Sequence, residues 1–296
     1  MNGSLRRGKP LAELIDGSRT VFLPGSYDAL SAMLVEQAGF ELAYIGSSTS
    51  AASSYGLPDV GAVTLDELAR AAKAAANAIT IPLIADAEGG FLEPANIWRT
   101  VRAFEDAGVA GIHIEDHAGS KHTELGKRLI PLEQMLQKLR AAREARRDPH
   151  FEIIARTDAI WTHGDVGEAI RRMQAFAQLG CNFVFPTFAT PAMLKKIRPA
   201  VGARILVIDL PQVKQFSEWF GLADIVLNYG FCIYAAAKGV KTALARVGRQ
   251  PASTVLDDLL ETSAEFESRL GYDAYVDRAR RYSSFSTTKD TKYTKE

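Results

Sequence analysis

The sequence predicts an α/β protein of the (β/α)8 TIM-barrel class. Two observations lead to this prediction: eight short apolar runs rich in β-branched residues recur along the chain, and stretches with helical periodicity separate them. Strands that are apolar throughout, without alternation, are typical of a parallel sheet covered by helices. Eight strand–helix units match a closed barrel better than a doubly wound sheet, and a length of 296 residues is compatible with one such barrel.

The strands are expected in the eight apolar runs, at residues 20–23, 41–45, 81–85, 110–114, 151–155, 182–185, 204–208 and 224–228. The intervening helices carry end signals, such as a predicted capping box formed by Thr64 and by Glu67 three residues later. Four of the helices end in a glycine that an apolar run follows, and a glycine accepts the left-handed conformation of the C′ position. These glycines are Gly39, Gly108, Gly180 and Gly221. The repetition indicates one architectural unit used several times.

Two segments lie outside the eight units. Residues 4–16 are expected to form an extra N-terminal helix, and residues 250–280 keep a helical pattern although no barrel position remains for them. The predicted organisation is a single barrel domain with a C-terminal helical extension over residues 1–282. The polar, aperiodic residues 283–296 are expected to be a disordered tail.

The composition excludes several classes of function. Thirty-five basic and thirty-five acidic side chains give no net charge, so no long-range field attracts nucleic acid or a membrane surface, and we expect neither as a partner. Neither a signal-peptide pattern nor an apolar run of about 18 residues occurs, which indicates a cytoplasmic protein. Cys181 and Cys232 lie in apolar segments without metal-ligand spacing, and we expect small core residues rather than a disulfide or a zinc site.

Polar residues follow four consecutive predicted strands directly. The ends of barrel strands at their carboxyl side are where the sites of barrel enzymes lie. The four polar strand ends are residues 44–48 (YIGSS), 86–90 (DAEGG), 113–117 (HIEDH) and 156–158 (RTD). The sequence therefore predicts one site built from these segments.

Three carboxylates are expected to converge at this site. Asp86 and Glu88 are two residues apart on what we expect to be an extended segment, so their side chains point the same way, and Glu115 ends the adjacent strand. Such a group cannot stay ionised together without a cation. Because all the donors are hard oxygens, Mg²⁺ or Mn²⁺ is favoured over zinc.

Other residues at the strand ends are suited to binding a small carboxylic acid. Arg156 supplies a fixed planar cation for a carboxylate or a developing enolate oxygen. Gly46, Ser47 and Ser48 offer backbone and hydroxyl donors for a second carboxylate. The expected partner is therefore a small carboxylic-acid substrate.

Four motifs in this order resemble the isocitrate lyase/phosphoenolpyruvate mutase superfamily, and within it the short methylisocitrate lyase-like members. The motifs are YIGSSTSAASSYGLPDVG, DAEGGF, GIHIEDHAGSK and IIARTDA, and the similarity extends over roughly residues 10–245. The resemblance implies a Mg²⁺-binding (β/α)8 enzyme that acts on small 2-oxo, 2-hydroxy or phosphonate acids through an enolpyruvate-like intermediate. It also implies a homodimer or homotetramer whose subunits exchange their C-terminal helices, which would account for residues 250–280.

The resemblance implies roles for individual residues. The three carboxylates named above would hold the metal, directly or through water, with Asp59 of the GLPD motif close by in the substrate site. Gly46 and Ser47 would bind the substrate carboxylate, and Arg156 would contact the substrate oxygens. Tyr44 matches a tyrosine proposed as the base in the lyases.

The loop after the E-D motif departs from the lyases. They carry K-[RK]-C-G-H there, with a cysteine that protonates the enolate, whereas this loop keeps Lys121 but has Thr123 at the cysteine position. The proton donor should then be a loop group or a water that the loop positions, and among Lys121, His122 and Glu124 the histidine fits best because its pKa lies nearest to neutral. His117, just before the loop, is expected to be solvated.

Two further departures concern substrate binding. Thr187 stands where a glutamate is usual at the end of the sixth strand, and residues 208–210 (Ile-Asp-Leu) replace an asparagine-rich strand end. Three functions therefore stay open. The first is a carbon–carbon lyase that cleaves a small 2-hydroxy di- or tricarboxylic acid, methylisocitrate- or dimethylmalate-like, to a 2-oxo acid. The second is an oxaloacetate decarboxylase-like or phosphonopyruvate-type enzyme, and the third is a metal-binding protein without catalysis.

Overall fold

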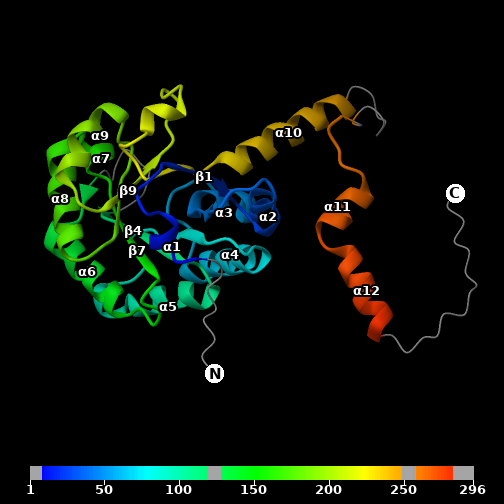
Figure 1. The fold of residues 1–296 in the computed structure, drawn as a ribbon, viewed down its shortest axis with the longest axis horizontal. Helices are drawn as coiled ribbons and strands as arrows, with labels where there is room; N and C mark the ends of the chain where they lie inside the picture. The colour runs from blue at the N-terminus through cyan, green and yellow to red at the C-terminus, as the bar shows by residue number, and fades with distance from the viewer. Residues whose placement is uncertain (1–8, 119–127, 249–255, 257, 283–296) are drawn as a thin grey trace, which may run out of the picture. The chain divides into compact units, whose positions relative to one another are not determined.

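The structure is a computed structural model that describes residues 9–118, 128–248, 256 and 258–282. Its contacts divide the chain into two units, Met1–Ala235 and Ala236–Glu296, each of which is described by itself. The first unit is a closed barrel of eight parallel strands in the order β1-β10-β9-β8-β7-β4-β3-β2, surrounded by helices (Figure 1). The predicted fold class is confirmed.

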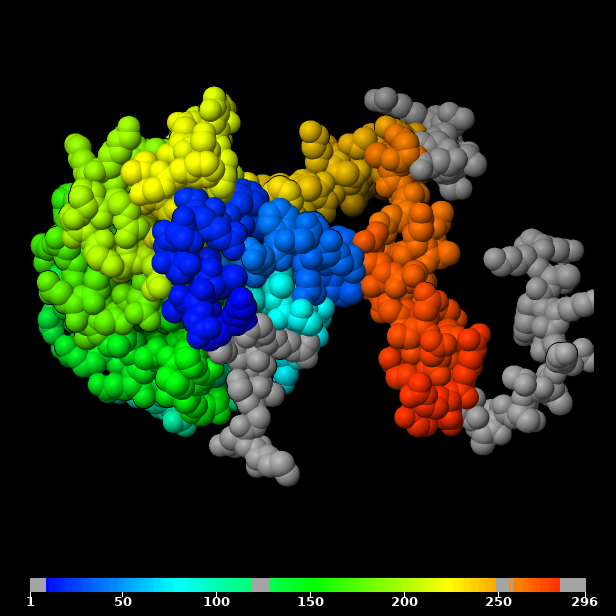
Figure 2. Space-filling model, viewed as in Figure 1, coloured from blue at the N-terminus to red at the C-terminus, as the bar shows by residue number. Residues whose placement is uncertain are grey.

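Every barrel strand overlaps one of the eight predicted runs. The strands are β1 (Val21–Ser26), β2 (Ala43–Ile45), β3 (Leu83–Asp86), β4 (Gly111–Glu115), β7 (Glu152–Thr157), β8 (Phe183–Pro186), β9 (Arg204–Ile208) and β10 (Ile225–Asn228). The barrel closes where β1 pairs with β10, Val21 lying opposite Ile225. Figure 2 shows the consequence on the surface, where the N-terminal residues in blue lie against the yellow residues of the last barrel units.

Several helices of the first unit have the predicted end signals, whereas the segment expected to be helical at residues 4–16 forms, among its described residues, a helix only over Leu11–Leu14. They are α1 (Leu11–Leu14), α2 (Ala29–Gln37), α3 (Ser47–Tyr55), α4 (Leu65–Ala78), α5 (Trp98–Ala107), α6 (Leu132–Glu144), α7 (Ala159–His163), α8 (Val166–Gln178) and α9 (Pro191–Ile197). The capping box at the start of α4 is confirmed, since the Thr64 N–H donates to Glu67 Oε2 at 2.8 Å. The four predicted C′ glycines are all left-handed, with φ between 72° and 94°.

A short hairpin that the sequence did not predict lies between β4 and α6. It pairs β5 (His117–Ala118) with β6 (Arg128–Leu129) in antiparallel orientation. The segment between the two strands, which carries Lys121, His122, Thr123 and Glu124, lies outside the described residues.

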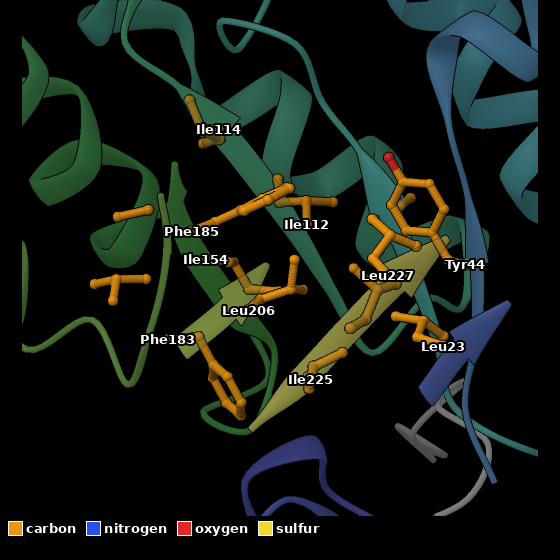
Figure 3. Packing of buried hydrophobic residues seen from close by; sticks show 14 of the residues in the cluster. Leu23, Tyr44, Ile112, Ile114, Ile154, Phe183, Phe185, Leu206, Ile225 and Leu227 are labelled. Carbon is orange, nitrogen blue, oxygen red and sulfur yellow. The ribbon is translucent and has the colours of Figure 1, made fainter. Parts of the chain in front are cut away.

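The interior of the barrel is packed with side chains from its strands (Figure 3). Leu23, Phe183 and Ile225 are among the apolar residues of this core, each at most 1% exposed. Toward the carboxyl ends of the strands the filling becomes aromatic and polar, with Tyr44 and His113 also buried. A barrel filled in this way leaves the rim at the carboxyl ends of the strands as the place for a site.

The second unit contains most of α10 (Phe231–Val247), together with α11 (Ser263–Arg269) and α12 (Tyr272–Tyr282). These three helices have no buried residue, and large apolar side chains on them are exposed, including Val240, Leu244 and Tyr275. Helices α11 and α12 fall mostly within the predicted helical segment, whereas the expected tail at 283–296 lies outside the described residues. Among the helices that the structure describes, none has the length and apolar character of a membrane span.

Candidate active site

The structure brings Asp86, Glu88 and Glu115 together at the rim. Asp86 ends β3 and Glu115 ends the neighbouring β4. One carboxylate oxygen of each residue lies within 4.8 Å of those of the other two, and the three residues are 4%, 8% and 3% exposed. Like charges held this close in a buried place favour either protonation or a bound cation.

The backbone carries Glu88 into this cluster by a different route from the expected one. Strand β3 ends at Asp86, and Glu88 has a φ of 50°, so it lies in a left-handed turn and the expectation of an extended segment is wrong. A non-glycine residue in this conformation costs roughly 1–3 kcal/mol and persists where its surroundings hold it. Here the Glu88 N–H donates to Asp86 Oδ1 at 2.8 Å, and the Glu88 carbonyl accepts from the Glu115 N–H at 2.9 Å.

Arg156 on β7 is the cation of the cluster. Its Nη1 lies 2.9 Å from Glu115 Oε2, in accord with the strand register that pairs these two residues. Its Nε and Nη2 donate to Asp158 Oδ1 and Oδ2 at 2.8 and 3.2 Å, and the guanidinium lies over the Phe185 ring. Asp158 already balances Arg156, and Lys138, the other cation that interacts with Glu115, is shared with Glu93, so the three carboxylates keep an excess of negative charge. An all-oxygen, negatively charged cluster of this kind fits a divalent cation such as Mg²⁺.

Tyr44 on β2 and His113 on β4 form a buried pair beneath the cluster. Tyr44 Oη lies 3.0 Å from His113 Nε2, and His113 Nδ1 lies 3.5 Å from Asp86 Oδ1. Burial, together with the charge of Asp86, raises the pKa of Tyr44 well above its usual value, so the side chain is a neutral phenol at neutral pH. His113 is not among the predicted site residues, although a histidine within an otherwise apolar strand is a signal for such a role.

A pocket opens beside the cluster at the same rim. Its walls are formed by Tyr44, Ser48, Asp59, Asp86, Arg156, Phe185, Thr187, Phe188, Ile208, Leu227 and Tyr229. Arg156 is the one cation in this set, and the side opposite the carboxylates is mainly apolar and aromatic. Thr187 is 1% exposed, and its hydroxyl has no hydrogen-bond partner among the described residues, which leaves it available to a ligand.

The glycine–serine segment after β2 divides between two tasks. Ser47 turns toward the cluster, since its hydroxyl donates to Asp86 Oδ2 at 2.9 Å and its N–H lies 3.4 Å from the same oxygen. Ser48 lines the pocket in the first turn of α3, and Gly46 is the N-cap of that helix. A side chain at Gly46 would crowd the ring of Tyr44, 3.0 Å from the position of a Cβ.

His117 is buried, and the expectation of a solvated side chain is wrong. Its side chain is 2% exposed, its Nδ1 lies 3.7 Å from Asp158 Oδ2, and its ring packs against Trp161 with 5.0 Å between centroids. The reason is the hairpin, in which His117 pairs with Leu129 instead of starting a free loop.

Neither cysteine lines the pocket. Cys181 is buried and Cys232 is half-buried, and burial raises the pKa of each thiol to about 11. Lys121 and His122, predicted as catalytic residues, lie outside the described residues.

Comparison with known proteins places the chain in a family. Residues 11–247 match the family model of phosphoenolpyruvate phosphomutase. The chain belongs to the isocitrate lyase/phosphoenolpyruvate mutase superfamily. The 2-methylisocitrate lyase of Escherichia coli (strain K12) is 36% identical over 283 residues, which cover 92% of this chain and 94% of that enzyme. The 2,3-dimethylmalate lyase of Eubacterium barkeri is 38% identical over 177 residues, 59% of this chain and 61% of that enzyme.

A solved structure of the superfamily agrees with the fold. Phosphonopyruvate hydrolase, crystallised with oxalate and Mg²⁺, superposes with a TM-score of 0.82 at 28% identity, over 92% of this chain and 96% of that one. The superfamily suggested by the sequence motifs is thus confirmed, and the relatives also confirm the expectation of a lyase-type enzyme.

Replacement of Asp86 by alanine should weaken the binding of Mn²⁺ at least about 100-fold, since even loss of an outer partner of a metal ligand costs 10- to 100-fold. Isothermal titration calorimetry measures this affinity directly. Asp209→Ala is the matched control, because Asp209 also follows a barrel strand but accepts a hydrogen bond from Asn228 and is not part of the cluster. Equal Mn²⁺ affinity in Asp86→Ala and wild type would contradict the assignment.

Proposed function

We propose that the protein is a Mg²⁺-dependent lyase that breaks a carbon–carbon bond of a small 2-hydroxy dicarboxylic acid and releases a 2-oxo acid. The observation that carries the proposal is the pocket in which a cluster of three buried carboxylates and one arginine faces an apolar wall. Asp86, Glu88 and Glu115 would hold the Mg²⁺, which supplies charge stabilisation for the oxygen anions of the substrate.

The bond cleavage needs one proton removed and one proton delivered. The substrate hydroxyl loses its proton, the bond between C2 and C3 breaks, and C2 becomes the carbonyl of the 2-oxo acid. The electron pair of that bond stays with C3, which forms an enolate together with its carboxylate. A proton then adds to C3. The oxidation states of the two products balance without any further reactant.

Tyr44 would take the hydroxyl proton. Its high pKa argues against a free phenolate, but its Oη lies 3.0 Å from His113 Nε2. Tyr44 can therefore accept the substrate proton at Oη while it passes its own proton to His113. The nearby Asp86 carboxylate favours the imidazolium that forms.

Arg156 and the start of α3 are suited to the two carboxylates of the substrate. The guanidinium of Arg156 lies at the pocket wall and is held in one plane by Asp158. At the other side, Ser48 and the Gly46 N-cap present the N-terminal turn of a helix, which favours an anion. Asp59 and Thr187 would complete substrate binding from the remaining walls.

The distal wall favours a dicarboxylic acid over a tricarboxylic one. Ile208 on β9 and Leu227 on β10 line the pocket across the barrel from β3 and β4, and Phe188 adds to this apolar wall; no second cation occurs among the described lining residues. A third carboxylate buried there would lack a partner, whereas methyl groups would be accommodated. A 2,3-dimethylmalate-like acid meets these requirements.

With Mg²⁺ added, 2,3-dimethylmalate should yield pyruvate, with a kcat/KM at least about tenfold above that for 2-methylisocitrate, because an unpaired charge against an apolar wall is rejected strongly. A coupled assay for pyruvate measures both substrates, and EDTA should abolish turnover. A preference for 2-methylisocitrate would contradict the assigned substrate class, and full activity in EDTA would contradict the role of the metal.

One observation favours a second candidate function. Thr123 replaces the loop cysteine of the lyases, and decarboxylation of an oxaloacetate-type acid needs no thiol acid. Cleavage of a carbon–phosphorus bond, as the name of phosphonopyruvate hydrolase describes for that relative, uses the same kind of acidic substrate. Oxaloacetate and phosphonopyruvate therefore belong in the same assay panel, the second with detection of phosphate.

For the lyase reaction, we propose His122 as the donor that protonates the enolate, with Lys121 beside it. A general acid contributes about 10²- to 10⁴-fold to the rate, so His122→Ala should lower kcat at least about tenfold while Mn²⁺ affinity stays unchanged. Cys232→Ser is the control and should retain kcat, since Cys232 does not line the pocket. An inactive Cys232→Ser together with a normal His122→Ala would show that the thiol is the acid.

We also propose that residues 1–282 form one barrel domain whose helical extension is exchanged within a homodimer or homotetramer. The exposed apolar residues of α10 to α12 support this, because such surface is normally covered by a partner. Multi-angle light scattering at micromolar concentration should give a multiple of 32.2 kDa. Leu244→Glu should shift the protein toward smaller species, whereas Lys238→Glu on the same helix should not. A wild-type monomer would contradict the proposal.

A further inference from the structure

A series of buried charges connects the candidate site to helix α8 on the outside of the barrel. Arg172 on α8 is 5% exposed, although it belongs to an outer helix. Its Nη1 donates to Asp116 Oδ2 and to the Ile130 carbonyl, both at 3.0 Å, and its Nε donates to Glu168 Oε1 at 2.7 Å. A guanidinium used in this way is held on several sides at once.

Asp116 joins the ends of two barrel strands. It follows Glu115 directly at the end of β4 and is fully buried. Its Oδ1 accepts from the N–H of Asp158, beyond β7, at 2.9 Å, and its carbonyl accepts from the N–H of Ile130 at 2.9 Å. Arg172 thus contacts the Asp116 carboxylate, which also accepts from the backbone beyond the neighbouring strand β7, and the carbonyl of Ile130.

Asp158, whose backbone is held by Asp116, in turn holds the guanidinium of Arg156. Both of its carboxylate oxygens accept from the guanidinium, at 2.8 and 3.2 Å, and the third nitrogen of that guanidinium lies 2.9 Å from Glu115. A planar cation bound at two edges keeps one orientation. The orientation of Arg156 therefore depends on where the Asp158 backbone is held, and that is set by Asp116.

We propose that Arg172 is a positioning residue for the candidate site, acting through Asp116 and Asp158 to keep the Arg156 guanidinium in the plane that meets the substrate oxygens. The inference rests on the proposed function, since it takes Arg156 to bind the substrate. Removal of Arg172 would leave Asp116 buried without its cation, close to Asp158, so the two carboxylates would move apart.

The test compares Arg172→Met and Arg172→Lys with Arg171→Met. Arg171 is the matched control, because it pairs with the same Glu168 but its side chain is 58% exposed and, among the described residues, forms no hydrogen bond with Asp116 or Ile130. Each variant is titrated with Mn²⁺ and then, at saturating Mn²⁺, with oxalate, a planar dianion that resembles an enolpyruvate. Thermal unfolding of each variant is measured in parallel.

Arg172→Met should bind oxalate at least about tenfold more weakly than wild type, with Mn²⁺ affinity within about threefold, because its partners lie next to the metal ligands without replacing them. Arg172→Lys should lose less oxalate affinity than Arg172→Met. Its ammonium keeps the positive charge but cannot reach all three acceptors that the guanidinium contacts. Arg171→Met should match wild type in both titrations. A purely structural role would lower the unfolding temperature and leave oxalate affinity unchanged.

If folded Arg172→Met binds oxalate as tightly as wild type does, this inference is overturned while the proposed function stands. Should Arg172→Met fail to fold, Arg172→Lys decides in the same way: weaker oxalate binding at unchanged Mn²⁺ affinity supports the inference, and unchanged oxalate binding overturns it. Failure of the Mn²⁺-loaded wild-type protein to bind oxalate would overturn the proposed function and this inference with it.

Discussion

The negative charge of three buried carboxylates is the constraint on which the rim of this barrel depends. Asp86, Glu88 and Glu115 come within 4.8 Å of one another where little water can screen them. Several polar neighbours compensate part of this charge: Ser47 and the Glu88 N–H donate to Asp86, and Arg156 lies against Glu115. A divalent cation would neutralise the negative charge that these donors leave uncompensated.

The compensation does not end at the cluster, because each added charge needs a partner of its own in a buried place. Arg156 is balanced by Asp158, Asp158 is held through its N–H by Asp116, and Asp116 is balanced by Arg172 from an outer helix. Burial nevertheless raises the pKa of Asp116 to about 6, which shows how costly a carboxylate is at this depth. These alternating charges thus connect strands β4 and β7 to helix α8 near the site.

The barrel also divides its chemistry around the rim. Strands β2, β3, β4 and β7 contribute charged and polar residues at their carboxyl ends, such as Tyr44, Asp86 and Arg156. The late strands β8, β9 and β10 contribute the apolar wall, for example through Phe185, Ile208 and Leu227. Under the proposed function the first set would serve the reaction and the second set the choice of substrate, so the substrate could change without disturbing the carboxylate cluster.

The sequence by itself determined the barrel and the location of its site. Apolar runs, helix caps and C′ glycines are local signals, and polar strand ends such as Asp86 and Arg156 necessarily meet when parallel strands close into a ring. Tertiary structure alone decided the left-handed turn at Glu88, the burial of His117, the pairing of Tyr44 with His113 and that of Asp116 with Arg172. These pairs are 69 and 56 residues apart in the chain. Contacts of that range depend on strand register and on how an outer helix packs, and no local pattern of residues encodes either one.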